Sequence, residues 1–345
     1  MLPSLEKVLV VGPSWVGDMV MAQSLFISLK QKNPDVRIDV VAPDWSLPLL
    51  TRMPEVREGI GLPVGHGELK LAQRWRIGRL LKKTIAYQQA IVLPRSFKSA
   101  LIPFFARIPV RTGYRGELRF GLINDMRSMR KKLDQTVKRF AALGLRKNES
   151  DDVVVNGLYP QPRLRIDSEN QLRLLDKLDL DKDKPVISLM PGAEYGPAKQ
   201  WPLASFAELA RHFYEKGFQV WILGSEKDSA TANEILELSE NAAINLCGKT
   251  TLTDAVDLIA YSKVAVSNDS GLMHIAAAVG CPLVAIYGSS SPAFTPPLTE
   301  RASIMYLNVE CSPCFKRECP FGHYKCLREI GVETVAVMVD RRLAN

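Results

Sequence analysis

An apolar run that ends in a small polar loop, just ahead of an apolar helix pattern, most constrains the fold of this chain. Val264 to Val266 indicate a buried strand, and the loop Asn268-Asp-Ser-Gly271 follows it. A helical pattern begins at Leu272. In open α/β sheets such a loop binds ligands, because unpaired backbone N–H groups at the helix start favour an anion. We therefore expect an anionic, hydroxyl-bearing ligand here, with Asp269 accepting from its hydroxyls or orienting the loop.

The alternation of short apolar runs with helix patterns recurs along both halves of the chain. It predicts parallel strands near residues 7–11, 37–42, 90–93, 185–190, 218–223, 243–246 and 282–287. A length of 345 residues favours two domains, and a polar segment with paired Asp residues and prolines separates the halves. We predict an α/β fold of two Rossmann-like domains, residues 1–165 and 166–328, with parallel sheets facing across a cleft. A final helix within 329–345 is expected to return to the first domain.

The charge is divided unevenly between the halves. Residues 1–150 hold 26 Lys and Arg against 12 Asp and Glu, a net charge of +14, whereas the whole chain carries +8. The excess indicates an acidic partner (anionic lipid, a phosphorylated substrate or nucleic acid) or a solvated basic surface. No RNA-binding aromatic motif or DNA-reading element accompanies it, which argues against nucleic acid. No apolar run spans a bilayer and no signal peptide precedes the first strand, so we expect a cytoplasmic protein.

The loop after the first strand presents one carboxylate at a helix start. Its sequence, Gly12-Pro-Ser-Trp-Val-Gly-Asp18, is neither the dinucleotide fingerprint nor a P-loop. Asp18 is therefore either a helix N-cap or a general base that faces the cleft.

Two further loops follow predicted strands of the second half. Lys199 lies in a loop stiffened by Gly and Pro beside a helix start, which suits a diphosphate, although a solvated surface lysine is the alternative. Glu226 and Asp228 follow the next strand, where an acidic residue takes ribose hydroxyls in nucleotide-binding folds. N-capping of the following helix explains Asp228 equally well.

Four cysteines near the C-terminus have the pattern C-x2-C-x4-C-x6-C, at Cys311, Cys314, Cys319 and Cys326. The first pair has zinc-ligand spacing, and His323 is an alternative ligand. Reduced thiols packed in a loop are the other interpretation, because disulfides are disfavoured in the cytosol.

Five segments, in order along most of the chain, resemble the ADP-heptose:lipopolysaccharide heptosyltransferases of glycosyltransferase family 9. They are Gly12-Pro-Ser-Trp-Val-Gly-Asp-Met-Val-Met-Ala-Gln-Ser-Leu25, Arg111-Thr-Gly-Tyr-Arg-Gly-Glu-Leu118, Pro191-Gly-Ala-Glu-Tyr-Gly-Pro-Ala-Lys199, Asn268-Asp-Ser-Gly-Leu-Met-His274 and Tyr287-Gly-Ser-Ser-Ser-Pro-Ala-Phe-Thr-Pro-Pro297. The resemblance implies a GT-B fold and an inverting enzyme that needs no metal for catalysis. It implies transfer of heptose from ADP-L-glycero-D-manno-heptose to the first heptose of the Kdo-lipid A inner core. The alternatives are another heptosyltransferase specificity (I or III) or a nucleotide-sugar epimerase on the same fold.

The resemblance also assigns roles to residues of this chain, with Asp18 as the catalytic base. Donor contacts are implied for Lys199, Glu194, Tyr195, Asp228, Glu226, Asp269, Ser270, Gly271, Leu272 and His274. The ribose is implied to bind Asp228 ahead of Glu226. Acceptor contacts are expected at Trp15, Gly17, Arg95, Lys98 and Arg115, with Arg111, Arg119 and residues 127–132 as further candidates. The implied acceptor is an anionic Kdo-lipid A glycolipid, met by a monomer at the cytoplasmic face of the inner membrane.

Overall fold

The computed structural model describes residues 6–65, 67–147 and 149–344, and the chain divides into two units, Met1–Pro162 and Arg163–Asn345. The division lies three residues before the predicted boundary. The backbone N–H of Leu164 already donates to the carbonyl of Ala278, so the chain joins the second unit at this point.

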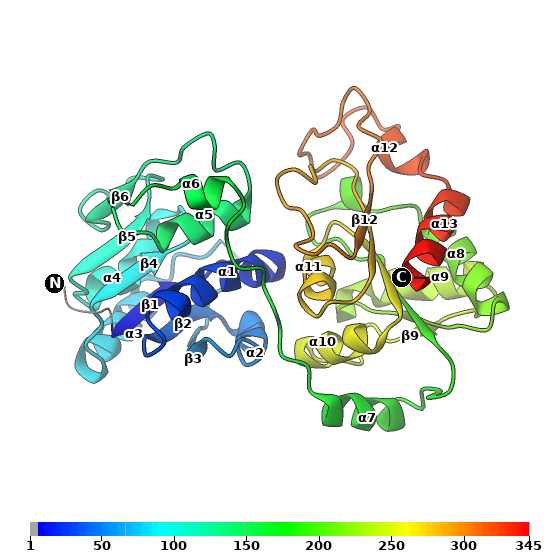
Figure 1. Cartoon of the computed structure of the whole chain (residues 1–345), viewed down its shortest axis with the longest axis horizontal. Coiled ribbons are helices and arrows are strands. Elements are labelled where there is room, and N and C mark those ends of the chain that lie inside the picture. Colours follow the sequence, from blue (N-terminus) through cyan, green and yellow to red (C-terminus); the bar gives the residue numbers. More distant parts are fainter. Residues whose placement is uncertain (1–5, 66, 148, 345) are drawn as a thin grey trace. The chain divides into compact units, whose positions relative to one another are not determined.

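The first unit is built on a six-stranded parallel sheet in the order β3-β2-β1-β4-β5-β6, within the described residues (Figure 1). The chain order turns back between β1 and β4, and open sheets bind ligands at the carboxyl ends of such a pair. The strands are β1 (Lys7–Val11), β2 (Arg37–Pro43), β3 (Val56–Leu62), β4 (Gln89–Val92), β5 (Val110–Tyr114) and β6 (Asp125–Arg127). The helices are α1 (Val16–Lys32), α2 (Leu47–Leu50), α3 (Leu71–Thr84), α4 (Leu101–Phe105), α5 (Thr136–Leu143) and α6 (Asp152–Val155), with 3-10 turns η1 (Asp44–Ser46) and η2 (Phe97–Ala100).

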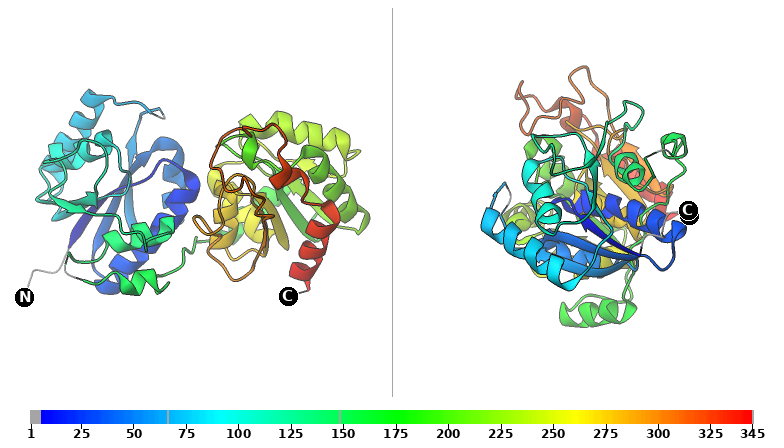
Figure 2. Two further views of the ribbon diagram at one scale, coloured as in Figure 1. Left: turned by 90° about the horizontal axis from the view of Figure 1, so that it is seen from above. Right: turned by 90° about the vertical axis from the view of Figure 1, so that its left-hand side faces the viewer.

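Helices cover both faces of this sheet (Figure 2). Helix α1 packs beside α5, and α3 packs beside α4. Strand β1 is buried on both faces, which is why its sequence is a continuous apolar run rather than an alternating one.

The second unit repeats the plan with the order β12-β11-β10-β7-β8-β9, again parallel throughout (Figure 1). Here the chain order turns back between β7 and β10. The strands are β7 (Val186–Met190), β8 (Gln219–Ile222), β9 (Ile244–Asn245), β10 (Val264–Asn268), β11 (Leu283–Ile286) and β12 (Ala302–Met305). The helices are α7 (Ser168–Lys177), α8 (Leu203–Glu215), α9 (Ser229–Leu238), α10 (Leu252–Tyr261), α11 (Gly271–Ala278), α12 (Lys325–Arg328) and α13 (Val332–Leu343), with 3-10 turns η3 (Pro197–Lys199) and η4 (Glu226–Asp228). The predicted α/β class with two parallel sheets is confirmed.

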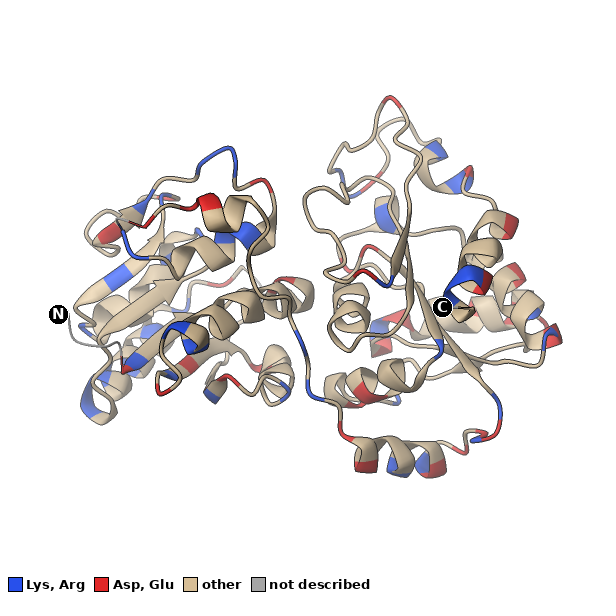
Figure 3. Ribbon diagram, in the orientation of Figure 1, with Lys and Arg blue, Asp and Glu red and all other residues tan. Residues whose placement is uncertain are grey.

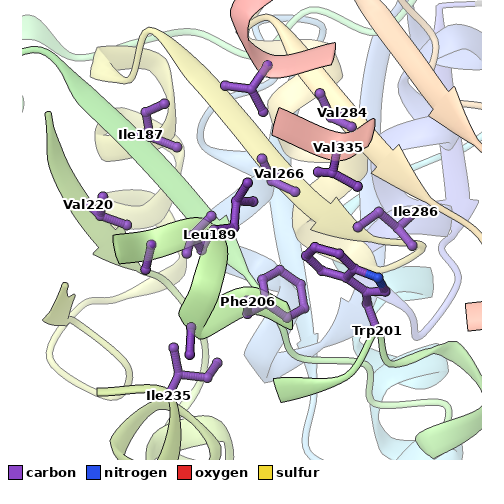
Figure 4. Close-up of a cluster of buried hydrophobic side chains, with 14 of the residues drawn as sticks. Ile187, Leu189, Trp201, Phe206, Val220, Ile235, Val266, Val284, Ile286 and Val335 are labelled. Carbon is purple, nitrogen blue, oxygen red and sulfur yellow. The ribbon is translucent and has the colours of Figure 1, made fainter. Parts of the chain in front are cut away.

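The last helix does not pack where the sequence analysis expected it. The buried face of α13, with Val335 and Val339, lies in the core of the second unit and contacts α8, β10 and β11 (Figure 4). An apolar helical pattern predicts that one face of a helix is buried, but it does not indicate which sheet covers that face.

No helix in the described part of the chain combines the length and apolarity that crossing a bilayer requires.

Candidate functional site

In the first unit, Asp18 lies in the first turn of α1, directly after the carboxyl end of β1. The N-cap of α1 is Trp15, which has an extended backbone, so Asp18 is the third helical residue. The interpretation of Asp18 as an N-cap is therefore wrong. Its side chain is half-buried, Gly17 is buried, and Trp15 is 37% exposed. The Asp18 carboxylate thus lies at the carboxyl edge of the first sheet, where open α/β sheets bind their ligands.

Basic residues follow the two neighbouring strands at the same edge. Arg95 comes after β4 and Arg115 after β5, and both side chains are exposed. The Arg95 Nε–H donates to the carbonyl of Arg115 at 3.3 Å. Gly116 permits this approach, since a Cβ there would lie 2.2 Å from the Arg95 carbonyl oxygen. Lys98 is half-buried in η2.

Two arginines that we expected at the acceptor are instead internal supports. Arg119 is fully buried, and its guanidinium donates to the carbonyls of Pro94 and Tyr114, which ties together the loops after β4 and β5. Burial lowers the pKa of Arg119 to about 10, and the nearby charge of Arg95 acts in the same direction. Arg111 donates to three carbonyl groups, those of Ile108, Gly121 and Leu122. Neither position was distinguishable from a surface arginine in the sequence.

The remaining basic cluster, residues 127–132, is divided between paired and solvated side chains. Arg127 pairs with Asp125, and Arg130 pairs with Asp151, each with an N–O distance of 2.8 Å. Lys131 and Lys132 are exposed.

In the second unit, Asn268 at the end of β10 joins this strand to the loop after β7. Its Oδ1 accepts from the backbone N–H of Trp201 at 3.0 Å, and its Nδ2 donates to the carbonyl of Pro191 at 2.6 Å. Trp201 is itself fully buried, with its indole N–H donating to the carbonyl of Ile330 (Figure 4). The loop 191–201 is thereby fixed at both ends against β10.

This fixed loop brings Lys199 to Asp269. The distance from Lys199 Nζ to Asp269 Oδ2 is 2.6 Å, and the side chains are only 17% and 4% exposed. The ammonium also lies 5.1 Å from the ring centre of Tyr195, as a cation–π contact. The alternative of a solvated surface lysine is therefore wrong. The pair joins the loop after β7 to the loop after β10, and the contact of Asp269 with ligand hydroxyls stays a prediction.

The amino terminus of α11 lies beside this ion pair. The first backbone N–H groups of any helix, here those of Gly271 and Leu272 onward, have no intrahelical acceptor. The N-cap residue Ser270 makes no side-chain cap hydrogen bond to them. His274 is buried on the same helix, and burial lowers the pKa of its ring to about 4, partly opposed by Asp269. The imidazole is therefore neutral at physiological pH.

The acidic loop after β8 separates the roles of Glu226 and Asp228. Oδ2 of Asp228 accepts from both the N–H and the hydroxyl of Ser225, at 2.8 and 2.7 Å, so Asp228 caps the start of η4 rather than helix α9. The carboxylate of Glu226 is exposed and extends over Gly248.

Two other predicted donor residues lie nearby and are already partnered. The carboxylate of Glu194 pairs with Lys227 at 2.9 Å. The Tyr195 hydroxyl donates to the carbonyl of Phe315 at 2.7 Å.

Ser289 and Ser290 are further candidate site residues, which were not predicted from the sequence. They follow β11, next to β10, and are 1% and 4% exposed. Their hydroxyl groups are buried and make no hydrogen bond within the described part of the protein. The Ser289 N–H donates to the carbonyl of Ala198, beside Lys199. Buried hydroxyls without partners at a ligand-binding edge are candidates for contact with a polar ligand, and their position after an apolar strand was the available signal.

The four C-terminal cysteines line one small cavity with His323. The backbone N–H of Lys325 donates to His323 Nδ1 at 3.1 Å, so a neutral ring carries its hydrogen on Nε2, which lies 4.0 Å from Cys311 Sγ. Burial and the neighbouring thiols raise the pKa of Cys326. Within residues 6–65, 67–147 and 149–344, no three His, Cys, Asp or Glu side chains form a group that could hold a metal ion. None of these four cysteines forms a disulfide, and the binding of zinc by them stays a prediction.

Comparison with known proteins relates this geometry to one family. Residues 74–325 match the family model described as glycosyltransferase family 9 (heptosyltransferase). The chain is 47% identical to lipopolysaccharide heptosyltransferase 2 of Salmonella typhimurium over 337 residues, which cover 95% of this chain and 96% of the relative. It is 44% identical to lipooligosaccharide heptosyltransferase 2 of Haemophilus ducreyi over 348 residues, covering 98% and 99%.

Solved structures agree with the sequence comparison. The structure of Escherichia coli ADP-heptose lps heptosyltransferase II superposes with a TM-score of 0.88 at 42% identity and covers 98% of both chains. The E. coli heptosyltransferase WaaC with ADP shares the fold, with a TM-score of 0.71 at 19% identity over 97% of this chain and 99% of that one. Because the family model matches most of the chain and the relatives share this much identity with it, the chain belongs to glycosyltransferase family 9, the heptosyltransferases.

Proposed function

We propose that the protein transfers heptose from ADP-L-glycero-D-manno-heptose to the first heptose of the Kdo-lipid A inner core, as an inverting lipopolysaccharide heptosyltransferase of type II. Near-complete coverage by heptosyltransferase 2 relatives supports this specificity over types I and III. The observation that carries the chemistry is the buried Lys199–Asp269 pair beside the α11 amino terminus, at the point where the second sheet turns back.

The donor diphosphate is proposed to bind between the Lys199 ammonium and the first N–H groups of α11. As the C1–O bond breaks, its electron pair moves onto the β-phosphate oxygen of ADP. A fixed cation and helix N–H groups stabilise this developing charge more than they stabilise the bound donor. Asp269 keeps the ammonium aimed, and the Ser289 and Ser290 hydroxyls supply further donors to the sugar diphosphate. No metal ion is needed in this scheme.

We propose that the nucleotide ribose binds Glu226 rather than Asp228, which reverses the order that the resemblance implied. A carboxylate takes ribose hydroxyls when its oxygens are open to accept them. Oδ2 of Asp228 already accepts two hydrogen bonds from Ser225, whereas the Glu226 carboxylate is exposed to solvent.

Asp18 is proposed as the general base. It accepts the proton of the acceptor hydroxyl while that oxygen attacks C1 from the face opposite the departing ADP, so the configuration at C1 inverts. Trp15 and Gly17 flank this carboxylate, and Arg95, Lys98 and Arg115 supply positive charge for the phosphorylated Kdo-lipid A acceptor. Such an acceptor implies a peripheral protein on the cytoplasmic face of the inner membrane. We further propose that the protein acts as a monomer.

The proposal is tested by incubating the protein with ADP-heptose and Kdo-lipid A acceptors that carry zero, one or two heptoses. We expect a mass increase of one heptose on the one-heptose acceptor, with the opposite anomeric configuration to the donor. Asp18→Asn should bind ADP normally and lose about 10²-fold or more in rate. Wild-type turnover in Asp18→Asn would refute the base assignment. Conversion of ADP-heptose without any acceptor would instead favour an epimerase.

A further inference from the structure

A basic cavity lies between α3 and α4 of the first unit, away from the residues assigned to catalysis. Its volume is about 400 Å³. It is lined by Trp75, Arg79, Lys82, Phe104, Phe105, Arg107 and Arg111. We refer to these seven residues as the α3–α4 pocket.

The pocket lies at the opposite end of the sheet from Asp18. Helix α3 leads into β4, so its last turns are at the strand's amino end, and Arg111 is the second residue of β5. Asp18 instead follows the carboxyl end of β1, a strand parallel to both. The pocket is therefore separate from the edge where the acceptor hydroxyl is proposed to react.

Close packing of the two helices forms the floor of the pocket. At Gly78 a Cβ would lie 2.6 Å from Phe105 Cβ and 2.8 Å from the carbonyl oxygen of Ile102. Because the helices touch there, the side chains one turn to either side are directed to the rim. Trp75 remains 48% exposed and Phe104 41% exposed.

The cations of the pocket have no acidic partner. Within the described residues, no carboxylate pairs with Arg79, Lys82, Arg107 or Arg111. Two of them lie over aromatic rings instead, Arg79 at 5.5 Å from the Trp75 ring centre and Arg111 at 5.8 Å from that of Phe104. Figure 3 shows that Lys and Arg recur along α3, in the orientation of Figure 1.

We propose that this face of α3 and α4 docks on an anionic lipid bilayer, with a lipid phosphate held in the α3–α4 pocket. The exposed rings of Trp75 and Phe104 fit the boundary between headgroups and acyl chains. Arg79, Lys82 and Arg107, which no carboxylate within the described residues neutralises, are the cations that meet lipid phosphate. The inference deepens the proposed function, since it explains how the enzyme stays near an acceptor embedded in a membrane.

The test measures co-sedimentation of the full chain with vesicles of phosphatidylcholine, alone or with one quarter phosphatidylglycerol. Neither donor nor acceptor glycolipid is present, so the result is independent of the transfer reaction. We expect binding to the anionic vesicles alone. Each basic residue at a membrane surface contributes about 5-fold, so Arg79→Gln/Lys82→Gln/Arg107→Gln should weaken binding on the order of 100-fold. Trp75→Ala should also weaken it.

A matched control removes the same charge elsewhere in the first unit. Lys30→Gln/Arg37→Gln/Lys147→Gln changes three cations that do not line the pocket. This variant should bind vesicles within a few-fold of wild type, and thermal unfolding should show that both triple variants are folded. Transfer to a detergent-dispersed acceptor should persist in the pocket variant, which separates this inference from the proposed function.

Three outcomes would overturn the inference. The first is wild-type vesicle binding by the pocket variant. The second is an equal loss in the control variant, which would mean that total charge alone matters. The third is release from vesicles by inorganic phosphate at constant ionic strength, which would make the pocket a site for a soluble anion.

Discussion

The Lys199–Asp269 ion pair offers a sharp test of how the second unit binds a diphosphate. Lys199→Ala removes a cation and also leaves the Asp269 carboxylate, 4% exposed, without its 2.6 Å partner. Both changes disfavour a bound anion. A carboxylate about 6 Å from one phosphate charge repels it by about 3 kcal/mol at an effective dielectric constant of about 20, roughly 100-fold in affinity.

A second substitution separates the two effects. Lys199→Ala/Asp269→Asn removes the cation and the unpaired anion together, so we expect it to bind ADP about 10- to 100-fold more tightly than Lys199→Ala. Isothermal titration calorimetry with ADP measures this, with the single Asp269→Asn variant completing the cycle. The melting temperature of the double variant should also be higher than that of Lys199→Ala, because an unpaired buried carboxylate destabilises the fold.

A double variant that binds ADP no better than Lys199→Ala, while both remain folded, would refute a role of this ion pair in diphosphate binding. The ion pair would then serve the fold rather than the diphosphate. A matched control is Lys227→Ala, which breaks the exposed pair with Glu194 and should leave ADP affinity within about 3-fold, as for other exposed pairs.

Three further predictions follow from the geometry. Glu226→Gln should weaken ADP binding about 10-fold and leave the melting temperature unchanged. Asp228→Ala should instead lower the melting temperature, because it removes two hydrogen bonds to Ser225. The reverse pattern would exchange the roles of the two residues. His274 has a pKa of about 4 in the folded protein and 6.5 in the unfolded chain, so protonation favours unfolding. Urea titrations should show the free energy of unfolding falling by about 1.4 kcal/mol per pH unit as the pH drops from 6.5 toward 4. The fall should be less steep in His274→Asn. Gly116→Ala places a Cβ against the Arg95 carbonyl and should cost about 1–3 kcal/mol of stability while ADP affinity is kept; an unchanged melting temperature would contradict it.

Several elements of the fold were predictable because their signals are local. Strands β1, β7 and β10 are mostly apolar and are buried on both faces, a pattern that is typical of parallel strands. A capping box formed by Thr251 and Asp254 begins α10, and such a box is a start signal between residues close together in the sequence. The loops that end these strands were predictable as candidate ligand sites, because parallel strands align their carboxyl ends at one edge of the sheet.

The partners of individual side chains were not predictable. Arg119 and Arg115 are four residues apart with the same chemistry, yet one is fully buried between two loops and the other is exposed. Nothing local distinguishes them, because the carbonyl groups that receive Arg119 belong to segments brought together by the sheet. The same holds for the α3–α4 pocket, whose cations come from α3, from the turn after α4 and from β5.

The sequence by itself determined the alternation of strands and helices, the two-unit organisation and the loops that bear Asp18, Lys199 and Asp269. Each of these depends on hydrophobic period, on glycine and proline, or on motif order, which are properties of adjacent residues. Tertiary structure decided that Lys199 is aimed by Asp269, that Asp228 is occupied by Ser225, and that α13 packs in the second unit. These depend on contacts between residues distant in sequence, whose free energy exists only after the chain has folded.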